Sequence, residues 1–141
     1  MYTAAVLTLE SIEILKNLAS RLGLEDFVYQ TPQGDALPHH MTINLGKFDE
    51  SLNDPLLLGQ EVEITIDSIW HCKTIGACAA KVSKTNCCGS EIKSSNTNKH
   101  ITICLKPPAK PVHSNKLFSE GSKVFIINEP LVLKAILQEI H

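Results

Sequence analysis

Alternation of apolar and polar residues in two short segments is the feature that most limits how this chain can fold. The segments lie in residues 38–46 (PHHMTINLG) and 99–105 (KHITICL). Successive side chains of a β-strand point to opposite faces of the sheet. Each segment therefore predicts a strand with one apolar face, formed by Met41, Ile43 and Leu45 in the first and by Ile101, Ile103 and Leu105 in the second.

The other face of each predicted strand begins with the same two residue types. The polar faces are formed by His40, Thr42 and Asn44 in the first strand and by His100, Thr102 and Cys104 in the second. A single histidine in a strand is usually a surface residue or a satisfied core residue. A histidine and a threonine at the same spacing in two strands indicate a paired site, because function requires such pairing and packing does not.

Two histidines and two threonines suit phosphoester chemistry. One imidazole can take a proton from the attacking oxygen while the other gives a proton to the leaving oxygen. Histidine fits both tasks because its ordinary pKa lies near neutrality, so a bell-shaped pH profile around neutrality is expected. The threonine hydroxyls can donate hydrogen bonds to non-bridging phosphate oxygens. The residues alone leave open which histidine is the acid and which is the base.

The motifs HMTI (40–43) and HITI (100–103) resemble the paired signature of the two-histidine (2H) phosphoesterase superfamily. The superfamily includes RNA 2′,3′-cyclic phosphodiesterases, 2′-5′ RNA ligase-like proteins and the cyclic phosphodiesterase modules of tRNA ligases. The resemblance implies a hydrolase that needs neither a metal nor another cofactor. The residues that it implies are His40 and His100 as the catalytic acid–base pair and Thr42 and Thr102 as phosphate ligands.

The resemblance also implies an α+β fold, a compact two-lobed antiparallel sheet in which each lobe gives one motif strand to a shared cleft. Helical spacing at residues 10–24 predicts one clear N-terminal helix, so the second lobe is expected to be reduced. Residues 1–141 are expected to form a single domain. Further strands are predicted at residues 2–9, 61–70, 75–82 and 123–128, residues 83–99 are predicted to be a mobile surface loop, and residues 131–140 fit either a helix or a strand.

The expected substrate carries a ribose 2′,3′-cyclic phosphate, either at an RNA end or on a nucleotide. Alternative functions are a phosphodiesterase for 2′-5′ oligoadenylates or cyclic nucleotides, and a non-catalytic module that binds nucleotides or RNA ends. The superfamily often adds an aromatic or basic residue that holds the base or the phosphate. Candidates for this role are Tyr2, Tyr29, Lys106 and Lys110, whereas His39 is interpreted as a non-catalytic neighbour that points to the opposite face if the strand extends that far.

Composition limits the partners and the location of the protein. The net charge is −2, so the chain as a whole lacks the basic character typical of proteins that bind long duplexes. The N-terminus resembles no signal peptide, and no stretch has the length and hydropathy of a membrane span. Five cysteines, an odd number, fit reduced thiols better than a disulfide framework. We therefore expect an intracellular, cytoplasmic protein without a membrane or an obligatory protein partner.

Zinc ligation by the cysteine-rich part of the chain is the main alternative chemistry. The residues concerned are His71, Cys72, Cys78, Cys87 and Cys88. Adjacent cysteines do not have the usual two-residue separation of zinc ligands. A cysteine inside an apolar strand, such as Cys78, commonly packs as a small hydrophobic residue. We therefore predict no metal site here.

Overall fold

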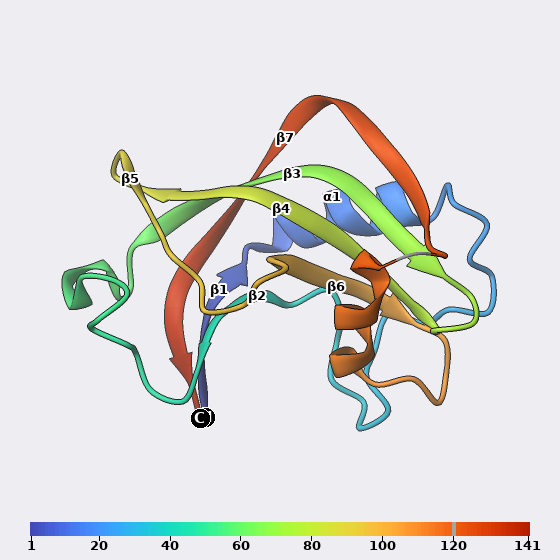
Figure 1. The fold of residues 1–141 in the computed structure, drawn as a ribbon, viewed down its shortest axis with the longest axis horizontal. Helices are drawn as coiled ribbons and strands as arrows, with labels where there is room; N and C mark the ends of the chain where they lie inside the picture. The colour runs from blue at the N-terminus through green and yellow to red at the C-terminus, as the bar shows by residue number, and fades with distance from the viewer. Residues whose placement is uncertain (120) are drawn as a thin grey trace.

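The structure, a computed structural model, describes residues 1–119 and 121–141. Within these residues, six antiparallel strands form a closed β-barrel, and a short seventh strand pairs with one of them (Figure 1). The order around the barrel is β3-β7-β1-β2-β6-β4, and pairing of β3 with β4 closes it. The strands are β1 (Tyr2–Leu7), β2 (His40–Leu45), β3 (Glu61–Cys72), β4 (Ala77–Cys87), β5 (Ser90–Glu91), β6 (His100–Leu105) and β7 (Lys123–Ile140).

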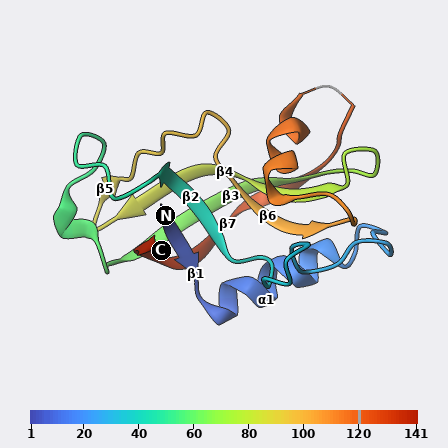
Figure 2. The ribbon, with the colours of Figure 1, turned by 90° about the horizontal axis from the view of Figure 1, so that it is seen from below.

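Among the described residues, three helical segments connect the strands. They are the α-helix α1 (Leu9–Ala19) and the 3₁₀ helices η1 (Pro55–Leu57) and η2 (Pro111–Phe118). Figure 2 shows α1 and η2 on opposite sides of the strands. The two chain termini lie next to each other because β1 pairs with the end of β7.

The predicted two-lobed α+β fold is wrong, because the protein is mainly β and its sheet closes on itself. Residues 131–140 continue β7, where Leu133, Ala135 and Leu137 are buried at alternate positions. Residues 83–87, which were predicted to be part of a loop, continue β4. These extensions let β7 pair with both β1 and β3, and let β3 pair with β4. No gap remains that would divide the sheet into two lobes.

The remaining strand predictions and the helix prediction are confirmed with changed boundaries. The helix predicted at 10–24 is α1, and it ends at Ala19, four residues before Gly23. Leu22 and Leu24 still pack against the main core from the turn after the helix. The helical spacing therefore correctly identified residues that pack against the core, although the helix covers only part of the predicted range.

Two apolar clusters hold the fold together and fix η2 on the barrel. The main cluster contains residues from the strands of the barrel and one face of α1. Because β4 is buried on both faces near its start, a second cluster forms on its other side. The second cluster consists of Leu37, Ala77, Ala79, Leu105, Ala109 and Leu117. Leu117 comes from η2, so this cluster holds η2 against β4 and β6.

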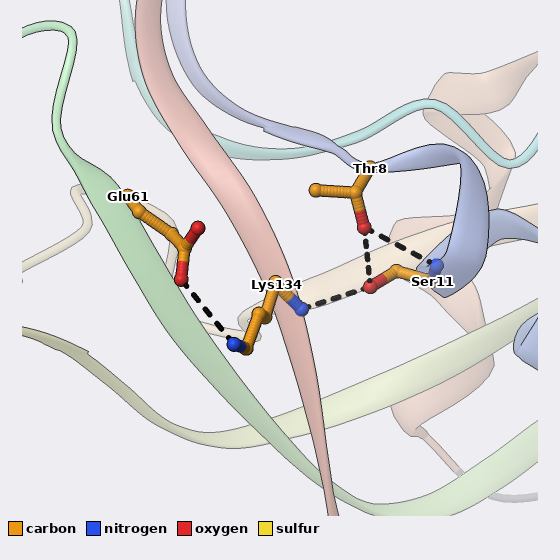
Figure 3. A network of polar contacts seen from close by, with 4 residues as sticks. All are labelled: Thr8, Ser11, Glu61 and Lys134. Carbon is orange, nitrogen blue, oxygen red and sulfur yellow. Dashed lines mark hydrogen bonds and ion pairs between the residues drawn. The ribbon is translucent and has the colours of Figure 1, made fainter.

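The start of α1 is tied to two strands by a short polar network (Figure 3). Thr8 is the N-cap residue, and its hydroxyl accepts a hydrogen bond from the backbone N–H of Ser11 at 3.3 Å and donates one to the Ser11 hydroxyl at 3.0 Å. The Ser11 hydroxyl accepts a second bond from the backbone N–H of Lys134 in β7 at 2.8 Å. Lys134 in turn forms an exposed ion pair with Glu61 of β3 at 3.5 Å. The N-cap therefore links the helix to the barrel.

We expect Thr8→Ala to lower the free energy of unfolding by about 1 kcal/mol, the usual effect of losing an N-cap side chain. Urea denaturation followed by circular dichroism measures this change. Thr97→Ala is the matched control, because Thr97 is exposed and lies outside the helices and strands. Its effect should stay within about 0.5 kcal/mol. Equal losses for the two variants would contradict the role of the cap.

Candidate active site

The two motif strands are neighbours in the barrel. β2 and β6 pair antiparallel through one pair of residues, Met41 and Ile101. Both side chains are fully buried in the main cluster. Because alternate residues of a strand point to opposite faces, the flanking residues of each motif point away from this core. The shared burial of these two apolar residues thus sets the register between the motifs.

This register brings together the four predicted site residues. An antiparallel alignment centred on the Met41–Ile101 pair places His40 across from Thr102, and His100 across from Thr42. All four residues line one pocket of about 1060 Å³. The predicted convergence of the two motifs on one cavity is therefore present in the structure.

Each motif strand contains a β-bulge at the same position, the last apolar residue of the motif. The pairing of β1 with β2 skips Ile43, and the pairing of β4 with β6 skips Ile103. A bulge turns the following side chains away from the expected alternation, and bulges are frequent beside active sites. The likeness between the two motif strands is limited to the region around the pocket. The rest of the sheet shows no division into two lobes, because β3 and β7 close the barrel.

The bulges explain three errors of the alternation pattern. Leu45, predicted to be on the apolar face, is 84% exposed at the rim of the pocket. Asn44, predicted to be on the polar face, is buried, and its amide donates hydrogen bonds to the backbone carbonyls of Leu45 and Lys47. Cys104 does not share the site with the second motif, because it is buried in the main cluster.

His100 is held by contacts on two sides. Its Nδ1 lies 2.6 Å from the backbone carbonyl of Asn98. A carbonyl only accepts hydrogen bonds, so Nδ1 carries the proton and Nε2 is the ring nitrogen left for substrate. The ring of Phe118 in η2 lies 5.3 Å from the His100 ring, between centroids. Burial lowers the pKa of His100, and the hydrogen bond to the Asn98 carbonyl partly opposes this shift.

His40 has a different environment. Its Nδ1 lies 2.9 Å from Nδ1 of His39, so one of these two nitrogens carries a proton and donates a hydrogen bond to the other. The Tyr2 ring lies 4.9 Å from the His40 ring, between centroids. Burial lowers the pKa of His40 to about 4, with further contributions from the charges of His39 and His100. Since β2 begins at His40, the alternation that would have turned His39 to the opposite face does not apply, and His39 lines the same pocket.

Two serines outside the predicted set of site residues support the motif strands, and one of them, Ser114, was interpreted from the sequence as a surface residue. The hydroxyl of Ser114 in η2 lies 2.9 Å from the hydroxyl of Thr102, and Ser114 is fully buried. The hydroxyl of Ser94 donates to the backbone carbonyl of Thr42 at 3.0 Å. Ser94 lies in the segment that was predicted to be a mobile surface loop. Its polar composition gave no signal that it contacts β2.

The four candidates for holding the base or the phosphate fall in different places. Tyr2 lines the pocket beside His40. Tyr29 packs against the main cluster, and its ring contacts the Lys16 ammonium from α1 at 5.2 Å. Lys106 lines a second pocket, and Lys110 is exposed at the start of η2. The structure thus places only Tyr2 with the paired motifs.

Neither a metal cluster nor a membrane helix is found in the part of the chain that the structure describes. Across residues 1–119 and 121–141, no three histidine, cysteine, aspartate or glutamate side chains lie close enough together to hold a metal ion. Over the same residues, no helix has the length and apolar character needed to cross a membrane.

Similarity to known proteins is found at the level of the fold. No family model matches this chain, and no curated protein matches it. Among solved structures, the crystal structure of a fungal RNA kinase matches with a TM-score of 0.60 and 16% sequence identity. The match covers 98% of this chain and 45% of the RNA kinase chain, so the present chain spans less than half of that protein. At this identity, the similarity shows a shared fold.

The lowered pKa of His40 predicts that stability depends on pH. In the unfolded chain histidine binds a proton near pH 6.5, whereas folded His40 binds one only near pH 4. The stabilisation is therefore complete above pH 6.5 and is lost as the pH falls towards 4. Between pH 7 and pH 4, wild type should lose about 3 kcal/mol more free energy of unfolding than His40→Asn, as measured by urea denaturation.

His141→Asn is the matched control for this experiment, since it changes an exposed histidine at the C-terminus. It should keep the wild-type pH dependence. If His40→Asn and wild type lost the same free energy of unfolding over this range, His40 would not be a partly buried histidine with a lowered pKa.

Proposed function

We propose that this protein is a metal-independent phosphodiesterase that opens 2′,3′-cyclic phosphates of RNA ends or nucleotides. The observation that carries the proposal is the convergence of His40, His100, Thr42 and Thr102 on one pocket. The set supplies two proton-transfer groups and two hydroxyl donors. Together these meet the needs of a phosphoryl group that is attacked on one side and loses an oxygen on the other.

The environments of the two histidines favour different roles in this reaction. The Asn98 carbonyl favours the charged form of His100, whereas the charges of His39 and His100 disfavour the charged form of His40. We therefore assign His40 as the base and His100 as the acid. The water oxygen forms a bond to phosphorus while His40 takes its proton. The bond from phosphorus to a ribose oxygen breaks, and His100 gives that oxygen a proton.

The threonines hold the charge on the phosphoryl group. Thr102 and Thr42 can each donate to a non-bridging oxygen, where negative charge must be stabilised in the transition state. We assign Ser114 as the donor in its 2.9 Å hydrogen bond with Thr102, which leaves the Thr102 hydroxyl proton for the phosphoryl oxygen. Thr42 lines the same pocket, and among the described residues no hydrogen bond engages its hydroxyl, so that hydroxyl is available to the substrate.

RNA as the substrate class is supported by two independent lines. The paired motifs resemble those of RNA cyclic phosphodiesterases, and the fold is shared with part of a fungal RNA kinase. Hydrolysis of 2′-5′ oligoadenylates or cyclic nucleotides would use the same four side chains, and a substrate panel distinguishes these activities. The non-enzymatic alternative is a module that binds nucleotides or RNA ends. Such a module would bind the cyclic phosphate but would not convert it to product.

Replacing either motif histidine should reduce kcat strongly. With a nucleoside 2′,3′-cyclic phosphate in the presence of EDTA, we expect His40→Ala and His100→Ala each to lower kcat by roughly 10²- to 10⁴-fold. Thr42→Ala and Thr102→Ala should lower it by on the order of 10- to 10³-fold. Product formation is measured by chromatography, and circular dichroism verifies folding.

His71→Ala is the matched control, because His71 is a partly buried strand histidine that does not line the pocket. His39→Ala should give an intermediate loss, since it removes the partner of His40 Nδ1. Near-normal turnover by folded His40→Ala and His100→Ala would reject the mechanism. Activity that EDTA abolishes and zinc restores would show that a metal carries the chemistry.

The pH profile should separate the free enzyme from the substrate complex. Both pKa values are lowered in the free protein, so its acid binds a proton at a lower pH than an ordinary histidine does. A bound phosphate anion raises the pKa of a nearby imidazole. We therefore expect the optimum of kcat/KM, which reports the free enzyme, to lie below pH 6.5, and that of kcat to lie at higher pH. Coinciding optima would contradict this account of the acid.

A further inference from the structure

The charges of this chain are strongly segregated. Residues 71–123 contain nine of the 13 basic residues and two of the 15 acidic residues. The almost neutral composition therefore hides a basic segment, residues 71–123, which contains all of β4, β5, β6 and η2 and the turns between them. Within the described residues, no lysine of this basic segment forms an ion pair, whereas the ion pair that is present joins Lys134 to Glu61.

Part of this basic segment forms a second pocket of about 540 Å³. Lys73, Lys106, Lys116 and His113 line it, and no acidic residue does so among those that the structure describes. The backbone N–H of Lys110 donates to Nδ1 of His113 at 2.9 Å. In the neutral ring the proton then lies on Nε2, so His113 presents a hydrogen-bond donor as well.

Close packing of two turns brings the lysines of this second pocket together. The Lys106 N–H donates to the Gly76 carbonyl at 2.8 Å. A Cβ atom on Gly76 would lie 3.0 Å from the Ala109 Cβ and 3.1 Å from the Lys106 carbonyl oxygen. Only glycine permits so close an approach, and its φ of +81° also favours glycine. The shape of the second pocket is therefore fixed by backbone packing between these two turns.

The second pocket lies on η2 beside the histidine pocket. A 3₁₀ helix has three residues per turn, so residues three apart share a face. Val112 and Asn115 line the histidine pocket, whereas His113 and Lys116 line the second pocket. The third face is turned to the protein interior, where Ser114 and Leu117 are buried. A ligand that crosses η2 can therefore contact both pockets at once.

We propose that the second pocket binds a backbone phosphate of single-stranded RNA whose 3′ end occupies the histidine pocket. The inference rests on the proposed function and extends it, because it makes an RNA strand rather than a free nucleotide the preferred substrate. Phosphates are the anions that such a strand presents at regular intervals, and clustered lysines bind them without reading the sequence.

The test compares two triple variants with the same change in charge. Lys73→Gln/Lys106→Gln/Lys116→Gln removes the lysines of the second pocket, and Lys16→Gln/Arg21→Gln/Lys134→Gln removes three basic residues outside residues 71–123. The probe is a fluorescein-labelled RNA strand of about ten nucleotides with a linear 3′-phosphate, which the enzyme cannot turn over. Fluorescence anisotropy at several salt concentrations gives the affinity and its salt dependence.

We expect the first triple variant to bind the RNA at least roughly 10-fold more weakly than wild type. The plot of log affinity against log salt should also become less steep, by about 1 to 2 in the magnitude of its slope. The control triple variant should bind like wild type. Hydrolysis of a nucleoside 2′,3′-cyclic phosphate should be equal in both variants, because a nucleotide does not reach the second pocket.

Equal RNA affinity in the two triple variants would overturn this inference. So would stronger competition by a polyglutamate peptide than by unlabelled RNA, because the second pocket would then favour an acidic protein partner. RNA binding is measured without turnover, so a wild-type protein that binds the probe at this pocket but hydrolyses no cyclic phosphate would reject the proposed function alone. The double variant Lys73→Gln/Lys116→Gln, which changes only exposed side chains, repeats the test if the triple variant is unfolded.

Discussion

The backbone pairing between Met41 and Ile101 is the constraint on which the candidate active site depends. It joins the two motif strands, and it buries one apolar side chain from each in the main core. Burying two such side chains contributes roughly 3 to 6 kcal/mol, so a slip in register would be costly. The four polar motif residues face the pocket because their apolar neighbours must face the core.

The environment of the two imidazoles follows from their position on a closed barrel. Partial burial removes water from both rings and lowers both pKa values, so the free site favours neutral histidines. The rings nevertheless differ, because His100 is hydrogen-bonded to a backbone carbonyl and His40 to the neighbouring His39. This difference is the basis of the distinct roles proposed for two residues that the sequence presents as equivalent.

The short helix η2 connects stability, the site and the basic surface. Its buried face holds it on β4 and β6 through Leu117, and Ser114 on the same face bonds to Thr102. Phe118, at the end of η2, contacts both His100 and Trp70. Its two other faces line the two pockets. A change that moves η2 would therefore alter the proposed phosphate ligand Thr102, the proposed acid His100 and the proposed RNA path together.

The sequence by itself determined the two motif strands, the four residues that share the pocket and most strand positions. These are local properties, since the alternation of side chains in a strand depends only on neighbouring residues. Tertiary structure alone decided that the sheet closes, because closure depends on pairing of β3 and β7 with distant strands. It also decided the bulges at Ile43 and Ile103, which reverse the alternation just after each motif. The contacts of His39, Ser94 and Ser114 join residues that the sequence pattern does not relate, so only the folded chain could bring them to the site.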